Sequence, residues 1–162
     1  MIENITDLYE NCFRGEPMAW HASSTMPLLK DITPEQASKH PIEGAHSIWE
    51  IIEHLPVYEE SAIKALEGGT FPVFLDGEEW PARKDYSEEA WVESVKLLED
   101  VHDRFVDAIR GFDVNRFGEL LDMDSRWPEP WQSTTYYQFI HGMLHHKVYH
   151  TAQIALLKKH KQ

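Results

Sequence analysis

The segment from about Ser133 to Lys159 predicts a long helix whose inward face carries polar side chains. Its apolar residues recur at helical steps of three and four and form one stripe, made up of Tyr136, Phe139, Met143 and Leu157. His146, His150 and Gln153 lie on that same stripe, because positions four and seven apart return to one helix face. Burying a polar side chain without a partner costs about 1–3 kcal/mol. The fold must therefore supply a partner for each of the three.

Three further segments have the periodicity of amphipathic helices, at about residues 2–13, 47–67 and 87–111. Ser47 and Glu50 have the spacing of a capping box, and Ser87 is a second candidate N-cap. Short helical turns are expected around 26–30 and 34–38, whereas residues 70–86 and the segment before the last helix are irregular. The sequence therefore predicts an all-α fold: a four-helix bundle of up-down-down-up type with two long connections, in a single domain over residues 1–162.

The composition argues against several classes of protein. The net charge of −13 argues against a nucleic-acid surface and against docking on anionic lipid, because both need clustered Lys and Arg. The single cysteine, Cys12, rules out an internal disulfide and a Cys-rich zinc module, and packing explains it better than nucleophilic chemistry. With no secretory signal and no apolar run of about 18 residues, we expect a cytoplasmic protein that does not span a membrane.

His54 is the candidate partner of the two histidines on the C-terminal helix. A His pair at i, i+4 can converge on one divalent metal, with hydrogen-bonded core or surface histidines as the alternative. In a bundle a third ligand comes from a facing helix, and His54 lies mid-helix on the face that carries Tyr58. Pro56 removes a backbone donor close by and predicts a kink. A second pair, His141 and His145, lies off the apolar stripe and is expected to face solvent.

Three motifs in order resemble those of one family. They are Trp20-His-Ala-Ser-Ser, Pro41-Ile-Glu-Gly-Ala-His-Ser-Ile-Trp-Glu-Ile-Ile-Glu-His54 and His146-Lys-Val-Tyr-His150-Thr-Ala-Gln-Ile. Together they resemble the DinB-like, YfiT-type superfamily of metal-binding four-helix bundles, over roughly residues 19–159. The resemblance implies that His54, His146 and His150 are the metal ligands. Departures from the family pattern, such as Lys147-Val148 before the final Tyr-His, remove no ligand and leave the substrate open.

The same resemblance implies the chemistry of the site. Three neutral histidines leave a divalent metal with open positions, as in catalytic centres. Imidazole ligands suit zinc or nickel first, with iron, cobalt and manganese as further candidates. Proteins of this family include S-transferases that use a low-molecular-weight thiol such as bacillithiol, and metal-dependent hydrolases. We expect a metal-dependent S-transferase or hydrolase of a small molecule; the alternative is a non-catalytic bundle whose metal is structural or sensory.

Further residues have two competing interpretations each. Glu50 lies one turn before His54 and is either a catalytic base or only the acid of the capping box. Gln153 is expected to hydrogen-bond within the site rather than to ligate the metal, with packing as the alternative. Five aromatic residues are candidates to line an apolar substrate pocket: Trp20, Trp49, Tyr58, Trp127 and Trp131.

We also expect the chain to self-associate as a homodimer. Two-fold dimers are the commonest soluble assembly, and several of the six tryptophans lie in connections where they can form a surface patch. The charge of −13 opposes association, but salt screens it beyond roughly 8 Å at physiological ionic strength. Burial of a standard interface should outweigh that repulsion.

Overall fold

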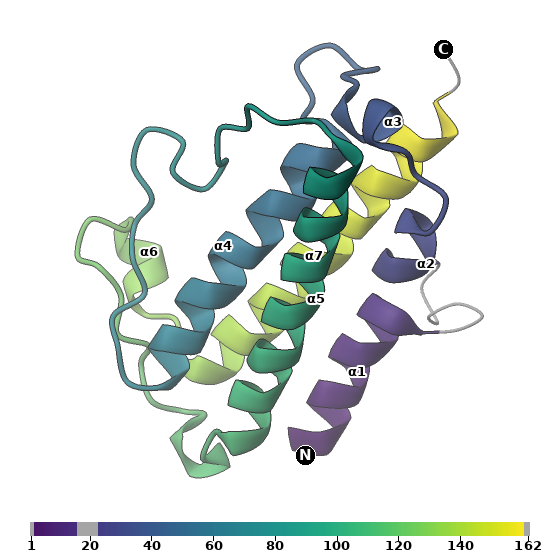
Figure 1. The fold of residues 1–162 in the computed structure, drawn as a ribbon. Helices are drawn as coiled ribbons and strands as arrows, with labels where there is room; N and C mark the ends of the chain where they lie inside the picture. Colours follow the sequence, from purple (N-terminus) through teal and green to yellow (C-terminus); the bar gives the residue numbers. More distant parts are fainter. Residues whose placement is uncertain (1, 16–22, 161–162) are drawn as a thin grey trace.

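Four long helices dominate the computed structural model, which describes residues 2–15 and 23–160 (Figure 1). They are α1 (Ile2–Arg14), α4 (Ile48–Leu66), α5 (Glu88–Gly111) and α7 (Tyr136–Lys159). The connections hold three short α-helices and one 3-10 turn: α2 (Thr25–Leu29), α3 (Pro34–Ser38), η1 (Val114–Arg116) and α6 (Glu129–Gln132). Over the described residues no strand forms, only two isolated β-bridges. The predicted all-α bundle is confirmed, and Trp20 lies outside the described residues.

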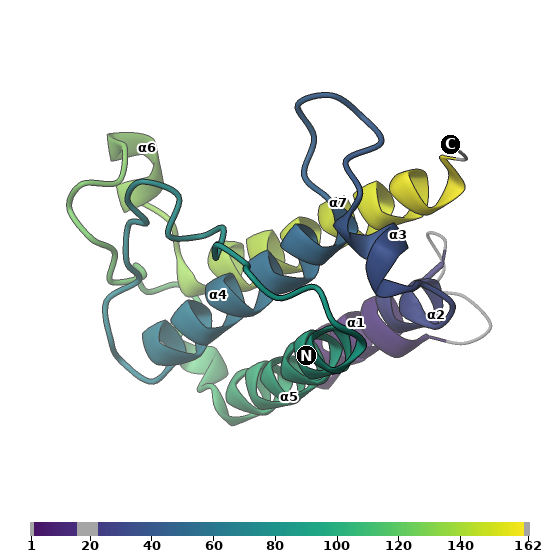
Figure 2. The ribbon, with the colours of Figure 1, turned by 45° about the horizontal axis from the view of Figure 1, so that its top comes forward.

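The long helices run up, down, down and up in chain order (Figure 1). They form two layers, with α1 beside α5 and α4 beside α7, and α4 also packs along α5 (Figure 2). Since α4 and α5 are neighbours that run the same way, the chain must return along the whole of α4, about 28 Å for its 19 residues. Residues 67–87 make this return. All three connections between long helices are long, where the sequence predicts two.

Side-chain caps set where the long helices begin. Ser47 and Glu50 form the predicted capping box at α4, which stays helical through Pro56, and Ser87 caps α5. The last helix begins at Tyr136 rather than near Ser133 because Thr135 is its N-cap. The backbone N–H of Gln138 donates to Thr135 Oγ1, and the Gln138 side chain accepts from the Thr135 backbone in return.

Two hydrophobic clusters fill the interior of the bundle, and polar side chains lie between them. One cluster contains Tyr9, Phe105 and Ile140, and the other contains Trp49, Ile52 and Leu98. Along α7 the first cluster ends at Leu144 and the second begins at Ile154, with Lys147, His150 and Thr151 buried in the interval. We call this interval, with the buried polar residues that face it from α4 and α5, the polar layer.

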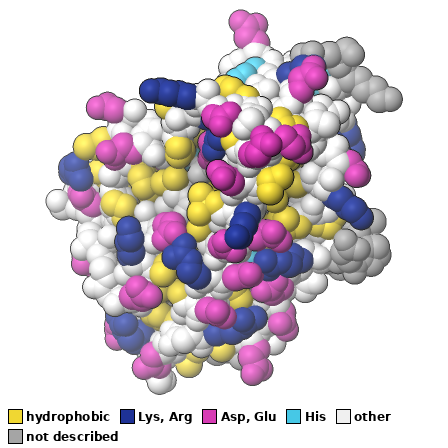
Figure 3. Space-filling model, in the orientation of Figure 1, with side chains coloured by type: hydrophobic (Ala, Val, Ile, Leu, Met, Phe, Trp, Pro, Cys, Tyr) yellow, Lys and Arg dark blue, Asp and Glu magenta, His cyan; other side chains and the backbone are white. Residues whose placement is uncertain are grey.

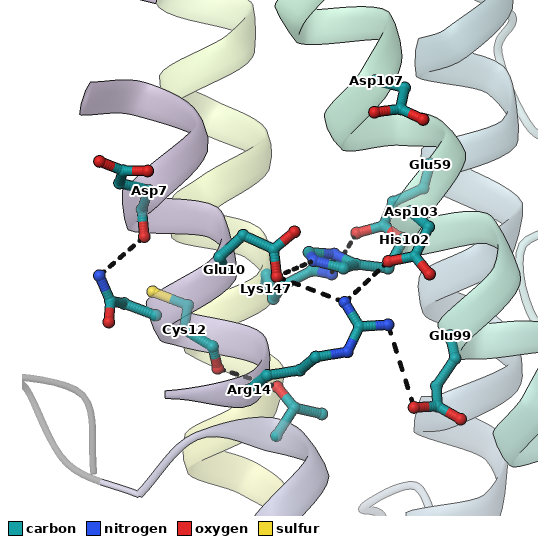
Figure 4. A network of polar contacts seen from close by, with 12 residues as sticks. Asp7, Glu10, Cys12, Arg14, Glu59, Glu99, His102, Asp103, Asp107 and Lys147 are labelled. Atoms are coloured by element: carbon teal, nitrogen blue, oxygen red, sulfur yellow. Dashed lines mark hydrogen bonds and ion pairs between the residues drawn. The ribbon is translucent and has the colours of Figure 1, made fainter. Parts of the chain in front are cut away.

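A lysine ion pair occupies one side of the polar layer (Figure 4). Lys147 is 1% exposed, and its Nζ lies 2.6 Å from Glu59 Oε1, itself on a side chain 2% exposed. The same ammonium donates to His102 Nδ1 at 2.7 Å and lies 4.3 Å from the centre of the Phe13 ring. Burial lowers the pKa of Lys147 and raises that of Glu59, and their attraction opposes both shifts. The attraction between the two opposite charges therefore keeps both side chains ionised at a position that is shielded from solvent.

The outer surface carries both signs of charge. Acidic side chains are spread over the face toward the viewer in Figure 3, with Lys and Arg set among them. Within the part of the chain that the structure describes, no helix is long and apolar enough to cross a membrane.

Removing one member of the buried pair should destabilise the bundle strongly. We expect Lys147→Met to lower the free energy of unfolding by about 3–5 kcal/mol, because Glu59 is left as an unpaired buried charge. The double variant Lys147→Met/Glu59→Leu should recover most of that loss, since no buried charge remains. Urea unfolding of metal-free protein measures both values. Lys64→Met, at an exposed lysine of α4, is the matched control. A double variant no more stable than Lys147→Met would contradict this interpretation.

Candidate metal centre

Three imidazoles from two helices converge on the other side of the polar layer. α4 provides His54, and α7 provides His146 and His150 one turn apart. His146 Nε2 lies 3.1 Å from His54 Nε2 and 3.0 Å from His150 Nε2. His54 and His150 are buried, at 3% and 4% exposed, whereas His146 is partly open to solvent. The predicted third histidine thus meets the predicted pair.

The hydrogen bonds at the far side of two rings fix where their lone pairs point. His54 Nδ1 lies 2.7 Å from the carbonyl oxygen of Glu79, which can only accept, so Nδ1 carries the proton. His150 Nδ1 lies 2.6 Å from the amide oxygen of Gln153 and donates to it in the same way. In the neutral rings both Nε2 atoms are then acceptors, and they face the Nε2 of His146. A single N–H of His146 cannot satisfy both of them, whereas a shared cation would.

The spacing of the three nitrogens fits a divalent metal. Zinc binds histidine nitrogen at about 2.0–2.1 Å in tetrahedral geometry, which places neighbouring nitrogens about 3.3 Å apart. The two Nε2–Nε2 separations in the structure, 3.1 and 3.0 Å, are close to that value. The carbonyl and amide partners are of the kind that orient metal-binding histidines in known sites. The chain therefore presents a buried group that fits one divalent ion.

The same burial keeps the three rings neutral, which is their ligating form. Burial, together with repulsion from His150, His54 and Lys147, lowers the pKa of His146 to about 3. Burial is also the main cause that lowers the pKa of His150 to about 4 and that of His54 below its ordinary value. Since free histidine titrates near 6.5, protons compete poorly for these nitrogens at neutral pH.

The return connection, residues 67–87, forms one wall of the site. Besides the carbonyl of Glu79, it supplies Trp80, whose ring stacks on His54 with the centres 3.9 Å apart. Arg83 fastens the connection to the bundle, because its guanidinium pairs with Glu53 of α4 and donates to Ser94 of α5 at 2.8 Å. Sequence reasoning treated this stretch as a loop and missed all three residues, since no helical period marks them.

The structure places the other predicted residues at different distances from the histidines. The Tyr58 ring is 4.9 Å from that of His54 and 4.7 Å from that of His146. Trp127 and Trp131 line a pocket together with Tyr58 and His146. Trp49 instead lies in the core, where its Nε1 donates to Ser94.

The Glu50 carboxylate already has hydrogen-bond partners at the start of α4. Its Oε2 accepts from the backbone of Ser47 at 2.7 Å and lies 2.8 Å from His40 Nε2. Burial acts to raise the pKa of Glu50, but the hydrogen bonds from Ser47 and His40 outweigh it and lower the pKa. These contacts favour the capping role, and the catalytic role stays a prediction.

A second cluster of potential ligands, formed by Glu10, His102 and Asp103, already has a cation (Figure 4). The Arg14 guanidinium lies 2.7 Å from Asp103 and 3.3 Å from Glu10. The arginine already pairs with both carboxylates, so this cluster is a weaker candidate for a metal.

Loss of one buried imidazole should empty the centre. We expect His150→Ala to retain less than about one tenth of the metal bound by the unchanged protein, because two ligands hold a divalent ion far less tightly than three. Elemental analysis after gel filtration measures the stoichiometry. His141→Ala, on the same helix but outside the group, should keep full metal. Full occupancy in His150→Ala would remove this ligand from the site.

Comparison with known proteins agrees with this geometry. The family model of the DinB superfamily matches residues 18–154 and thus includes all three histidines. Neither the curated proteins nor the solved structures include a match to the chain. Since the matched region is most of the sequence, the chain belongs to the DinB superfamily.

Proposed function

We propose that the protein is a metal-dependent enzyme that activates a thiol or a water molecule for S-transfer to, or hydrolysis of, a small substrate. The observation that carries this proposal is the composition of the ligand group. Among the described residues, His54, His146 and His150 form a group that no carboxylate or cysteine joins. Three protein ligands leave room for an exchangeable one, which is the arrangement of catalytic rather than structural zinc sites.

A metal bound there would lower the pKa of a coordinated water or thiol and so supply a nucleophile at neutral pH. The chain's own groups would hold that arrangement. Glu79 and Gln153 orient His54 and His150 through their Nδ1 protons. Trp80 covers one face of His54. His146, the partly exposed member, faces the side from which a substrate can approach.

One observation supports the non-catalytic alternative. The three histidines join α4 to α7, so a bound ion would cross-link two helices that are far apart in sequence. A structural or sensory metal would use the same ligands. Zinc or nickel as the metal, a homodimer and a cytoplasmic location stay predictions beside the proposed activity.

Metal-dependent turnover would distinguish the two functions. We expect zinc- or nickel-loaded protein to accelerate alkylation of a small thiol by monobromobimane, or hydrolysis of p-nitrophenyl acetate, at least tenfold over metal-free protein. For the thiol reaction, the gain should be largest below the thiol's own pKa of about 8.5, because the uncatalysed rate falls there with the thiolate fraction. Stopped-flow rates between pH 6.5 and 9 measure this. Strong destabilisation by a chelator, without turnover on either substrate, would favour the structural role.

A further inference from the structure

We infer that the pocket beside His146 binds a small, uncharged, apolar or aromatic molecule. The pocket has a volume of about 530 Å³, within the range of small-molecule sites. One side is formed by α7, and the rest by Tyr58 of α4 and by parts of the connections on either side of α5. Calling the bound molecule the substrate rests on the proposed function, whereas the binding itself does not.

The pocket and the metal centre share two side chains. His146 and Tyr58 line the pocket, and their rings are 4.7 Å apart. Tyr58 also lies against His54, with ring centres 4.9 Å apart. A molecule in the pocket would therefore lie against the one imidazole of the group that is partly open to solvent.

The described residues that line the pocket include no Lys, Arg, Asp or Glu. Its polar groups are uncharged hydroxyls, an amide, imidazoles and indole N–H groups, from Tyr58, Trp127, Trp131, Thr134, Gln138, Tyr149, His145 and His146. In metal-free protein an anionic ligand would lose hydration there without gaining a cationic side chain, and the chain's net charge of −13 opposes it further. Carboxylate-bearing thiols therefore fit this pocket poorly, whereas neutral molecules fit it well.

The walls suit a flat ring. Phe71 and Trp127 are nearly parallel, with an interplanar angle of 28° and ring centres 6.1 Å apart. Phe74 packs against Tyr58 in a tilted arrangement, with the ring centres 4.7 Å apart. These aromatic faces offer an apolar ligand large contact areas at a low cost in side-chain entropy.

Gly142 shows that the space is not filled by protein packing. It lies inside α7, where glycine is less favourable than any residue except proline, and it lines the pocket. A Cβ added at this position would meet no heavy atom within 4 Å. Nothing in the surrounding protein requires a glycine here, and since this exposed position lines the pocket, we expect a longer side chain to narrow it.

The experiment uses two ligands with the same ring and different charge. Binding of 2-naphthalenemethanol and of 2-naphthoate is followed at pH 8, where an ordinary histidine is neutral, by isothermal titration calorimetry on metal-free protein. We expect the neutral alcohol to bind with a Kd below about 1 mM and the anion to bind at least tenfold more weakly. Equal or tighter binding of the anion, or no binding of the alcohol at 1 mM, would overturn the inference.

Two substitutions at one position locate the binding. Gly142→Leu should weaken binding of the alcohol at least tenfold, because its side chain occupies the pocket. Gly142→Ala, which adds only one carbon, is the matched control and should stay within about threefold of the unchanged protein. Both variants should unfold at or above the original temperature, since both residues favour helix more than glycine does. Unchanged binding in a folded Gly142→Leu protein would place the ligand elsewhere.

The outcomes for pocket and catalysis are separable. If the naphthyl pair behaves as expected but no metal-dependent turnover exists, the proposed function fails and the binding site stands. If turnover exists but the anion binds as tightly as the alcohol, the proposed function stands and the inference about the ligand fails.

Discussion

The structure depends on how the bundle satisfies polar side chains buried between its two hydrophobic clusters. On one side Lys147 is neutralised by Glu59 and donates to His102. On the other side three imidazoles direct their Nε2 atoms at one point, and at least two of these atoms have no proton to share. Each buried polar atom left without a partner would cost about 1–3 kcal/mol, so the second half of the layer is complete only with a cation.

The two halves of the polar layer also explain how α7 is rotated about its own axis. Lys147 and His146 are consecutive, so they point to different sides of the helix: one into the ion pair and the other into the histidine group. α4 contributes to both halves in the same way, through Glu59 and His54. The ion pair thus fixes the rotation of the helices that bring the imidazoles together.

Much of this could be predicted from the sequence because the signals are local. Helical periodicity and caps such as Ser47 and Ser87 located the long helices, and the spacing of His146 and His150 placed both on one face. His54 could be proposed because it faces inward on its own helix. The use of Glu50 in the cap was one of two interpretations that the sequence left open.

The remainder depends on tertiary contacts, which no local pattern reveals. Lysine is almost never fully buried, so nothing in the sequence marks Lys147 as a core residue. The wall formed by Glu79, Trp80 and Arg83 depends on where a long connection crosses the bundle.

The most direct test of the account is X-ray absorption at the zinc edge of zinc-loaded protein, before and after adding a small thiol. We predict three imidazole nitrogens at about 2.0–2.1 Å and one light-atom ligand that sulfur replaces. A closed set of four protein ligands, unchanged by the thiol, would contradict it.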